Sequence, residues 1–189
     1  MVGTQLNKLK KEINHYIGIP YMINTLRDNK VVNEKFMGAK GTWQQIEAET
    51  KRIANLEKIN LKKLTKKQIY FFQKKHNLGI DCSGLATNLL IFYGKLINKE
   101  VNLDVRKTSA NLLTSNNLSK KIENYNDIKT GDLVRQKNGH HVLFITEKKN
   151  NTIYFVQNSI KSRKVTKGNF KLNDPSFENQ GIYRLLFFN

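Results

Sequence analysis

The hydrophobic pattern of this 189-residue chain changes its period near residue 130. Before that point apolar residues recur every three or four positions, as on one face of a helix. After it come four short segments rich in β-branched and aromatic residues: GDLVRQ (131–136), HHVLFITE (140–147), TIYFVQNS (152–159) and GIYRLLFF (181–188). Helices first and antiparallel strands later predict an α+β fold, with the sheet packed on a central helix.

Three helices are predicted ahead of the central one. Residues 6–17 carry apolar side chains at helical spacing, and this helix should stop at Gly18. Residues 22–42 have no regular period and predict a loop. Thr42 and Thr65 are suitable N-caps, so we expect a helix to begin directly after each of them.

The segment Cys82–Leu96 predicts the central helix. Asp81 is a suitable N-cap, and the apolar residues that follow cover almost the whole inner face of the helix. Only a short spacer separates the strands predicted at 140–147 and 152–159, which indicates a hairpin. We therefore expect the hairpin to form part of the sheet on which the central helix packs.

Length and composition favour one domain over residues 1–189. A hydrophobic content of 39% is enough for a core, and with two prolines the chain offers no obvious linker. The single cysteine cannot form an intrachain disulfide. The first residues lack the apolar core of a secretory signal, and no window is long enough for a membrane span. The route of delivery and the oligomeric state stay open.

The net charge of +18 suggests a polyanionic partner, either nucleic acid or an anionic cell envelope. Of the 33 cationic residues only six are arginine, and the lysines are scattered rather than grouped with aromatic residues. The chain is also rich in Lys, Asn and Ile, as AT-rich genomes encode. We therefore expect non-specific attraction to polyanions rather than a dedicated nucleic-acid site.

Cys82 has two interpretations. In the first turn of a helix a thiol meets unpaired N–H groups and the positive end of the helix dipole, which should lower its pKa from an ordinary value of about 8.5. Ser83 and Gly84 would let a substrate carbonyl approach, and the Cys82 N–H would be an oxyanion donor. Alternatively, Cys82 is an inert residue of the core, as buried cysteines often are.

The sequence GHHV offers a base for such a nucleophile. Successive residues of a strand point to opposite faces, so at most one of His140 and His141 can serve. A base needs a polar side chain to orient it, and Gln157 or Asn158 in the next strand could supply it. Taken alone, these features favour a structural role.

Taken together, DCSGL (81–85), GDLV (131–134) and HV (141–142), with a polar residue in the next strand, resemble the NlpC family of bacterial cell-wall cysteine peptidases. YIGIPY (16–21) is similar to a family motif that ends in a site tyrosine. The resemblance covers residues 13–21 and the chain from 79 onward. It implies a circularly permuted papain-like α+β fold, with a helical insertion at about 22–78.

The resemblance also implies the residues of the site. Cys82 would be the nucleophile, His141 the general base, and Gln157 the orienting residue, with Asn158 as the alternative to Gln157. The residues expected at the substrate and the oxyanion are Tyr21, Asp81 and Ser83. The expected reaction is hydrolysis of an amide bond in peptidoglycan stem peptides at the cell envelope, with no metal or organic cofactor.

The sequence departs from the family in three places, and three other functions stay open. MINTLRDN follows PY where a glycine pair is usual, the spacing from Tyr21 to Cys82 is much longer than usual, and Leu143 replaces a small residue after HV. The same core could catalyse transglutaminase-like acyl transfer or deamidation, although that class uses an aspartate as third residue. The chain could instead be a non-catalytic module that binds the wall or nucleic acid. Cys82 with His76, His140 or His141 could also bind a metal, but no recognised ligand spacing supports this.

Overall fold

The computed structural model describes residues 3–23, 25–27, 30–32 and 35–188. Its helices are α1 (Gly3–Tyr16), α2 (Trp43–Leu56), α3 (Lys66–Lys75), α4 (Cys82–Leu96) and α5 (Ala110–Leu113). Its strands are β1 (Thr25–Arg27), β2 (Lys30–Val32), β3 (Ser119–Lys121), β4 (Leu133–Gln136), β5 (His141–Lys149), β6 (Thr152–Asn158), β7 (Val165–Lys171) and β8 (Ile182–Leu185). Short 3-10 turns include η1 (Phe36–Ala39), η3 (Val105–Lys107) and η5 (Lys137–Gly139).

Six of these strands form one antiparallel sheet in the order β3-β8-β4-β5-β6-β7. The predicted hairpin of β5 and β6 is confirmed, with Phe144 opposite Val156 and Lys149 opposite Thr152. Strand β8 lies between β3 and β4, although it follows both in sequence. The sheet thus brings the segments 131–136, 140–147, 152–159 and 181–188 together.

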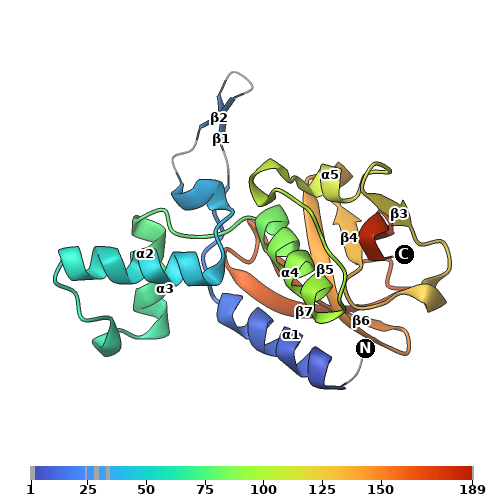
Figure 1. Cartoon of the computed structure of the whole chain (residues 1–189), viewed down its shortest axis with the longest axis horizontal. Coiled ribbons are helices and arrows are strands. Elements are labelled where there is room, and N and C mark those ends of the chain that lie inside the picture. The colour runs from blue at the N-terminus through green and yellow to red at the C-terminus, as the bar shows by residue number, and fades with distance from the viewer. Residues whose placement is uncertain (1–2, 24, 28–29, 33–34, 189) are drawn as a thin grey trace.

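The apolar helix α4 packs on the middle of this sheet. It contacts β5 and β6 of the sheet, and α1 runs beside it (Figure 1). Leu85 and Leu89 of α4 share one buried cluster with Phe144 of β5 and Val156 of β6. The expected fold class, an α+β antiparallel sheet packed on the helix that carries the cysteine, is confirmed.

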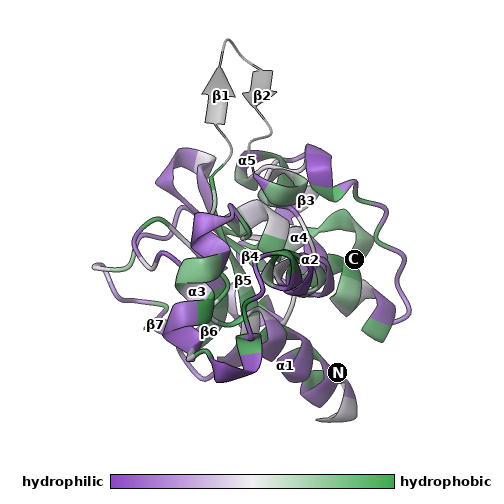
Figure 2. Ribbon diagram, turned by 90° about the vertical axis from the view of Figure 1, so that its left-hand side faces the viewer, coloured by the Kyte–Doolittle hydropathy of each residue, from purple (hydrophilic) through white to green (hydrophobic). Residues whose placement is uncertain are grey.

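The opposite face of the sheet is also covered. Val134, Leu143, Ile145 and Phe155 form a second buried cluster there. Burial on both faces explains why β5 begins with five consecutive buried residues instead of an alternating pattern. In Figure 2 the central strands carry hydrophobic colours, whereas α1 is mostly hydrophilic. Among the described residues no helix is both long and apolar enough to cross a membrane.

The helix starts follow the predicted caps. The side chains of Thr42 and Thr65 each accept a hydrogen bond from a backbone amide three residues on, and each forms a full capping box. Asp81 likewise accepts from the Gly84 amide at 2.6 Å. Trp43, at the start of α2, donates Nε1–H to Glu12 of α1 at 2.8 Å. Figure 1 shows α2 and α3 at one end of the molecule, beside the part formed by α4 and the sheet.

Two expectations about local structure need correction. Residues 22–42 were expected to form a loop, but β1 pairs with β2 and residues 36–39 form the turn η1. Residues 24, 28–29 and 33–34 of that stretch lie outside the described residues. The edge strands β3 and β7 were not predicted, because much of each strand is exposed and its sequence is largely polar.

Candidate active site

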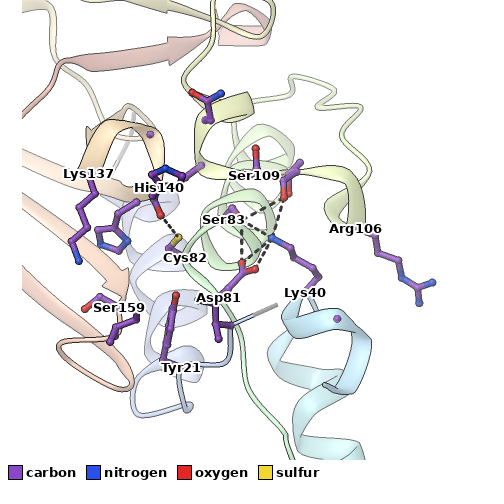
Figure 3. A pocket seen from close by; sticks show the side chains of 18 of the residues that line it. Tyr21, Lys40, Asp81, Cys82, Ser83, Arg106, Ser109, Lys137, His140 and Ser159 are labelled. Atoms are coloured by element: carbon purple, nitrogen blue, oxygen red, sulfur yellow. Dashed lines mark hydrogen bonds and ion pairs between the residues drawn. The ribbon is translucent and has the colours of Figure 1, made fainter. Parts of the chain in front are cut away.

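Cys82 is the first residue of α4, and its sulfur lies against the start of β5. The side chain is buried, with 7% of its surface exposed. Its Sγ makes a long S–H···O contact of 4.0 Å with the carbonyl oxygen of His140, drawn in Figure 3. Helix α4 therefore brings the thiol next to the backbone of the GHHV segment.

The expectation that the helix start lowers the pKa of Cys82 is wrong for this structure. Burial, with a smaller contribution from the neighbouring charge of Asp81, raises the pKa of the thiol to about 11. Backbone amides of Val142 and Ser83 and the charge of Lys40 act in the opposite direction but do not compensate. Desolvation thus outweighs the helix dipole, and the thiol is protonated at neutral pH.

His141, the first residue of β5, faces Gln157 of β6. Nε2 of the imidazole lies 2.8 Å from Oε1 of Gln157. Burial lowers the pKa of His141 below its ordinary value, while the hydrogen bond to Gln157 acts in the other direction. The imidazole is therefore neutral at pH 7. With Gln157 as acceptor, Nε2 carries the proton and Nδ1 keeps a free lone pair.

The two histidines of GHHV differ in exposure. His141 is buried, whereas His140 is exposed, and both line the cavity at Cys82. Among the described residues, the sulfur of Cys82 makes no hydrogen bond to the ring of either histidine; its contact is with the backbone of His140. Catalytic hydrogen bonds are often long in a free enzyme and shorten when substrate binds.

Asn158, the alternative third residue, lies away from the imidazole. Its Nδ2 donates to the carbonyl oxygen of Ile80 at 2.7 Å and to that of Pro20 at 3.2 Å. It thereby connects the end of β6 to the two segments that precede Tyr21 and Cys82. The structure thus brings Gln157, and not Asn158, to His141.

Asp81 and Ser83 flank Cys82 and share a buried lysine, Lys40. The ammonium group of Lys40 lies 2.8 Å from Oδ2 of Asp81 and donates to the hydroxyl of Ser83. It also donates to the carbonyl oxygen of Thr108 at 3.0 Å. Figure 3 shows Lys40 reaching Asp81 and Ser83 from the side of α4 opposite His140. Asp81 is therefore both a helix cap and half of an ion pair.

Tyr21 stands beside Cys82 on the remaining side of the site (Figure 3). Its backbone forms a parallel bridge with Ile80, and its N–H donates to the carbonyl oxygen of Arg163 at 2.8 Å. Burial, together with the proximity of Cys82 and Asp81, raises the pKa of the phenol well above its ordinary value. The hydroxyl therefore stays protonated and is able to donate a hydrogen bond.

These residues line a cavity of about 890 Å³, the size of a pocket for a short peptide or a drug-sized molecule. Tyr21, Asp81, Cys82, Ser83 and His141 all contribute to its wall. Of the site residues expected from the sequence, only Gln157 lies outside the lining, behind His141.

The sequence missed several parts of the cavity. Lys40 comes from the stretch that the resemblance left unmatched, and residues 106–111 form a further wall. No local signal distinguishes Lys40 from the many other lysines, because only the fold places it next to Asp81.

Within the described ranges, no three His, Cys, Asp or Glu side chains are grouped so as to hold a metal ion. Nε2 of His76, one of the residues considered for a metal, lies 3.2 Å from Oε1 of Glu57.

Comparison with known proteins gives similarity at the level of structure. No protein-family model and no curated protein matches the chain. The peptidoglycan hydrolase RipB from Mycobacterium tuberculosis is similar over 96% of this chain, with 17% identity and a TM-score of 0.46. The P60 domain of an antigen from M. avium subspecies paratuberculosis is similar over 96% of this chain, with 17% identity and a TM-score of 0.44. The chain covers 64% of the first structure and 94% of the second.

Proposed function

We propose that this chain is a cysteine hydrolase that cleaves an amide bond in peptidoglycan stem peptides. Cys82 is the nucleophile, His141 the general base and Gln157 the residue that orients the base. The observation that carries the proposal is the contact of 2.8 Å between His141 and Gln157, made beside the cavity that Cys82 lines. A buried neutral imidazole with one nitrogen fixed is suited to remove a proton from a neighbouring thiol.

The protonation states favour proton transfer during the reaction over a preformed thiolate. Because the thiol of Cys82 is protonated and His141 is neutral, Nδ1 of His141 takes the S–H proton as the sulfur attacks the substrate carbonyl. A C–S bond forms, and the π electrons of the carbonyl move to its oxygen. The N–H of Cys82 and the hydroxyl of Tyr21 stabilise this oxyanion.

The intermediate then collapses. The C–N bond breaks, and the leaving amine takes the proton from Nδ1 of His141, which leaves a thioester on Cys82. In the second half of the reaction His141 removes a proton from water, and the hydroxide attacks the thioester. The C–S bond breaks, and the sulfur recovers its proton from His141. The net reaction is hydrolysis of one amide bond.

The substrate class rests on the motifs and on charge. DCSGL, GDLV and HV resemble those of NlpC cell-wall peptidases. The net charge of +18 favours adsorption to an anionic envelope. An amide of a stem peptide, such as one between D-glutamate and a diamino acid, is the substrate that fits this resemblance.

The test is digestion of purified peptidoglycan, with the products identified by mass spectrometry. The wild-type protein should release peptides with one amide bond cleaved, and Cys82→Ala should release none while it remains folded by circular dichroism. Turnover by Cys82→Ala would refute the role of the thiol. A parallel digestion with an added primary amine separates hydrolysis from acyl transfer, because a transferase would give the amine adduct as the main product.

A further inference from the structure

The ion pair between Lys40 and Asp81 is buried beside the reactive sulfur. Lys40 is 7% exposed and Asp81 8% exposed, so water screens their charges little. The ammonium group lies 2.9 Å from Oδ1 and 2.8 Å from Oδ2 of Asp81, within reach of both carboxylate oxygens. Burying a lysine costs free energy unless its charge is paired. Here the ion pair lies next to Cys82, because Cys82 directly follows Asp81.

The turn that carries Lys40 is fixed to the start of α4 by its backbone. The amide of Asp81 donates to the carbonyl oxygen of Ala39 at 2.9 Å. Nδ2 of Asn88 donates to the carbonyl oxygens of Lys40 and Gly41, both at 3.3 Å. A Cβ at Gly84 would lie 2.8 Å from the Ala39 oxygen, so only glycine allows this close approach.

The backbone before Lys40 is strained, which indicates that its position is imposed by the surroundings. Met37 and Ala39 have φ values of 53° and 60°, a region that residues with a Cβ rarely occupy. Strain of this kind persists only where surrounding contacts determine the conformation, and it is concentrated at functional sites. Here those contacts are the ones that place Lys40 against Asp81.

The charges around the Cys82 sulfur come from several elements. Asp81 adjoins it at the cap of α4, and Lys40 approaches from the turn after η1. Tyr21 faces it from the segment after α1, His140 and His141 from the start of β5, and Lys137 from η5. Tyr21 and His141 are neutral, so the carboxylate of Asp81 is the anion that opposes formation of a thiolate. The ammonium group that touches this carboxylate offsets it.

We propose that Lys40 is a positioning residue for the Cys82 nucleophile: its ammonium group neutralises Asp81 and holds the Asp81–Ser83 turn in place. The inference rests on the proposed function, in which Cys82 is the nucleophile. It also gives a role to part of the segment 22–78, because this chain draws the counter-charge of its active site from that segment.

The experiment measures the rate of iodoacetamide alkylation of Cys82, the single cysteine, between pH 7 and pH 10.5. Three variants separate charge from structure: Lys40→Met, Asp81→Asn and the double variant. Lys40→Met should slow labelling at each pH below the thiol pKa on the order of tenfold, as a rise of one pKa unit requires. Asp81→Asn keeps a good helix cap and should accelerate labelling, and the double variant should fall between the two.

Lys107→Met is the control. Lys107 lines the same cavity, but its side chain is largely exposed and pairs with Asp104 at 3.7 Å. Its loss should leave the pH profile unchanged. If Lys40→Met does not fold, the opposite shift of Asp81→Asn and the intermediate position of the double variant still test the inference. Equal pH profiles for wild type, Asp81→Asn and the double variant would overturn it. Because labelling needs no peptidoglycan, this result is independent of whether the substrate is assigned correctly.

Discussion

Nε2 of His141 on β5 lies 2.8 Å from Oε1 of Gln157 on the neighbouring strand β6. The partner is a neutral amide, so it stabilises an imidazolium less than a carboxylate would. Burial lowers the pKa of His141 and the bond to Gln157 only partly offsets this, so the imidazole is neutral at pH 7.

Gln157→Leu should lower kcat about tenfold with little change in KM, as expected for the loss of one neutral hydrogen bond. The physical reason is that the imidazole loses its fixed orientation, while the substrate cavity is not lined by Gln157. Steady-state kinetics on a soluble muropeptide measure the two constants separately. A rise in KM with unchanged kcat would assign Gln157 to substrate binding instead.

The two histidines offer a matched pair of variants. His141→Ala should abolish turnover, because the base is lost, whereas His140→Ala should keep at least about a third of it. His140 contacts Cys82 through its backbone carbonyl, which the substitution retains, and its side chain is exposed. Loss of activity in His140→Ala with full activity in His141→Ala would show that His140, and not His141, is the base.

The pH dependence of kcat/KM distinguishes the two forms of cysteine catalysis. The neutral pair proposed here needs His141 unprotonated, and its pKa lies below the ordinary 6.5. Activity should therefore fall only on the acid side, below about pH 6.5, and stay level up to about pH 10, since the thiol pKa is about 11. A thiolate–imidazolium pair would instead lose activity on the alkaline side, where the imidazolium deprotonates. A bell-shaped profile centred near neutral pH would contradict the neutral pair.

The second buried ion pair supports the sheet. Nε of Arg184 lies 2.8 Å from Oδ1 of Asp132, and Nη2 of the same side chain lies 2.9 Å from Oδ2. Arg184→Met should lower the free energy of unfolding by about 3 kcal/mol, because it leaves a buried carboxylate without its partner. Arg52→Met, which breaks an exposed pair with Glu49, should leave the free energy of unfolding nearly unchanged. Urea unfolding at neutral pH measures both, and equal losses would show that burial is not the cause.

Periodicity in the sequence was enough to find the elements that bury apolar surface. Helices α1 and α4 and strands β4, β5, β6 and β8 were all expected, because each has a face that must leave water. The caps at Thr42, Thr65 and Asp81 were expected for a local reason, since their side chains bond amides three residues away. Strands β3 and β7 gave no such signal, because they pair through their backbones while much of their surface is exposed.

The pKa shifts of the site residues depend on burial, which a local sequence pattern does not reveal. The rule that a helix start activates a thiol considers the dipole and omits desolvation, so it gave the wrong direction for the pKa of Cys82. Gln157 and Asn158 were both candidates because their strand was expected to pair with that of His141, and the resemblance favoured Gln157, which the structure brings to the imidazole. Lys40 is 41 residues from Asp81 in sequence, and only the tertiary fold reveals that contact.

The interior position of β8 determines when the sheet can form during synthesis. Residues 182–185 fill an interior position of the sheet, between β3 and β4. During synthesis Cys82 and His141 leave the ribosome well before this strand, when one edge of β4 still lacks its partner. The sheet that supports the reactive helix can close only after residues 182–185 have emerged. We expect α4 to lack its complete supporting sheet until then, so that the position of Cys82 is fixed only late in synthesis.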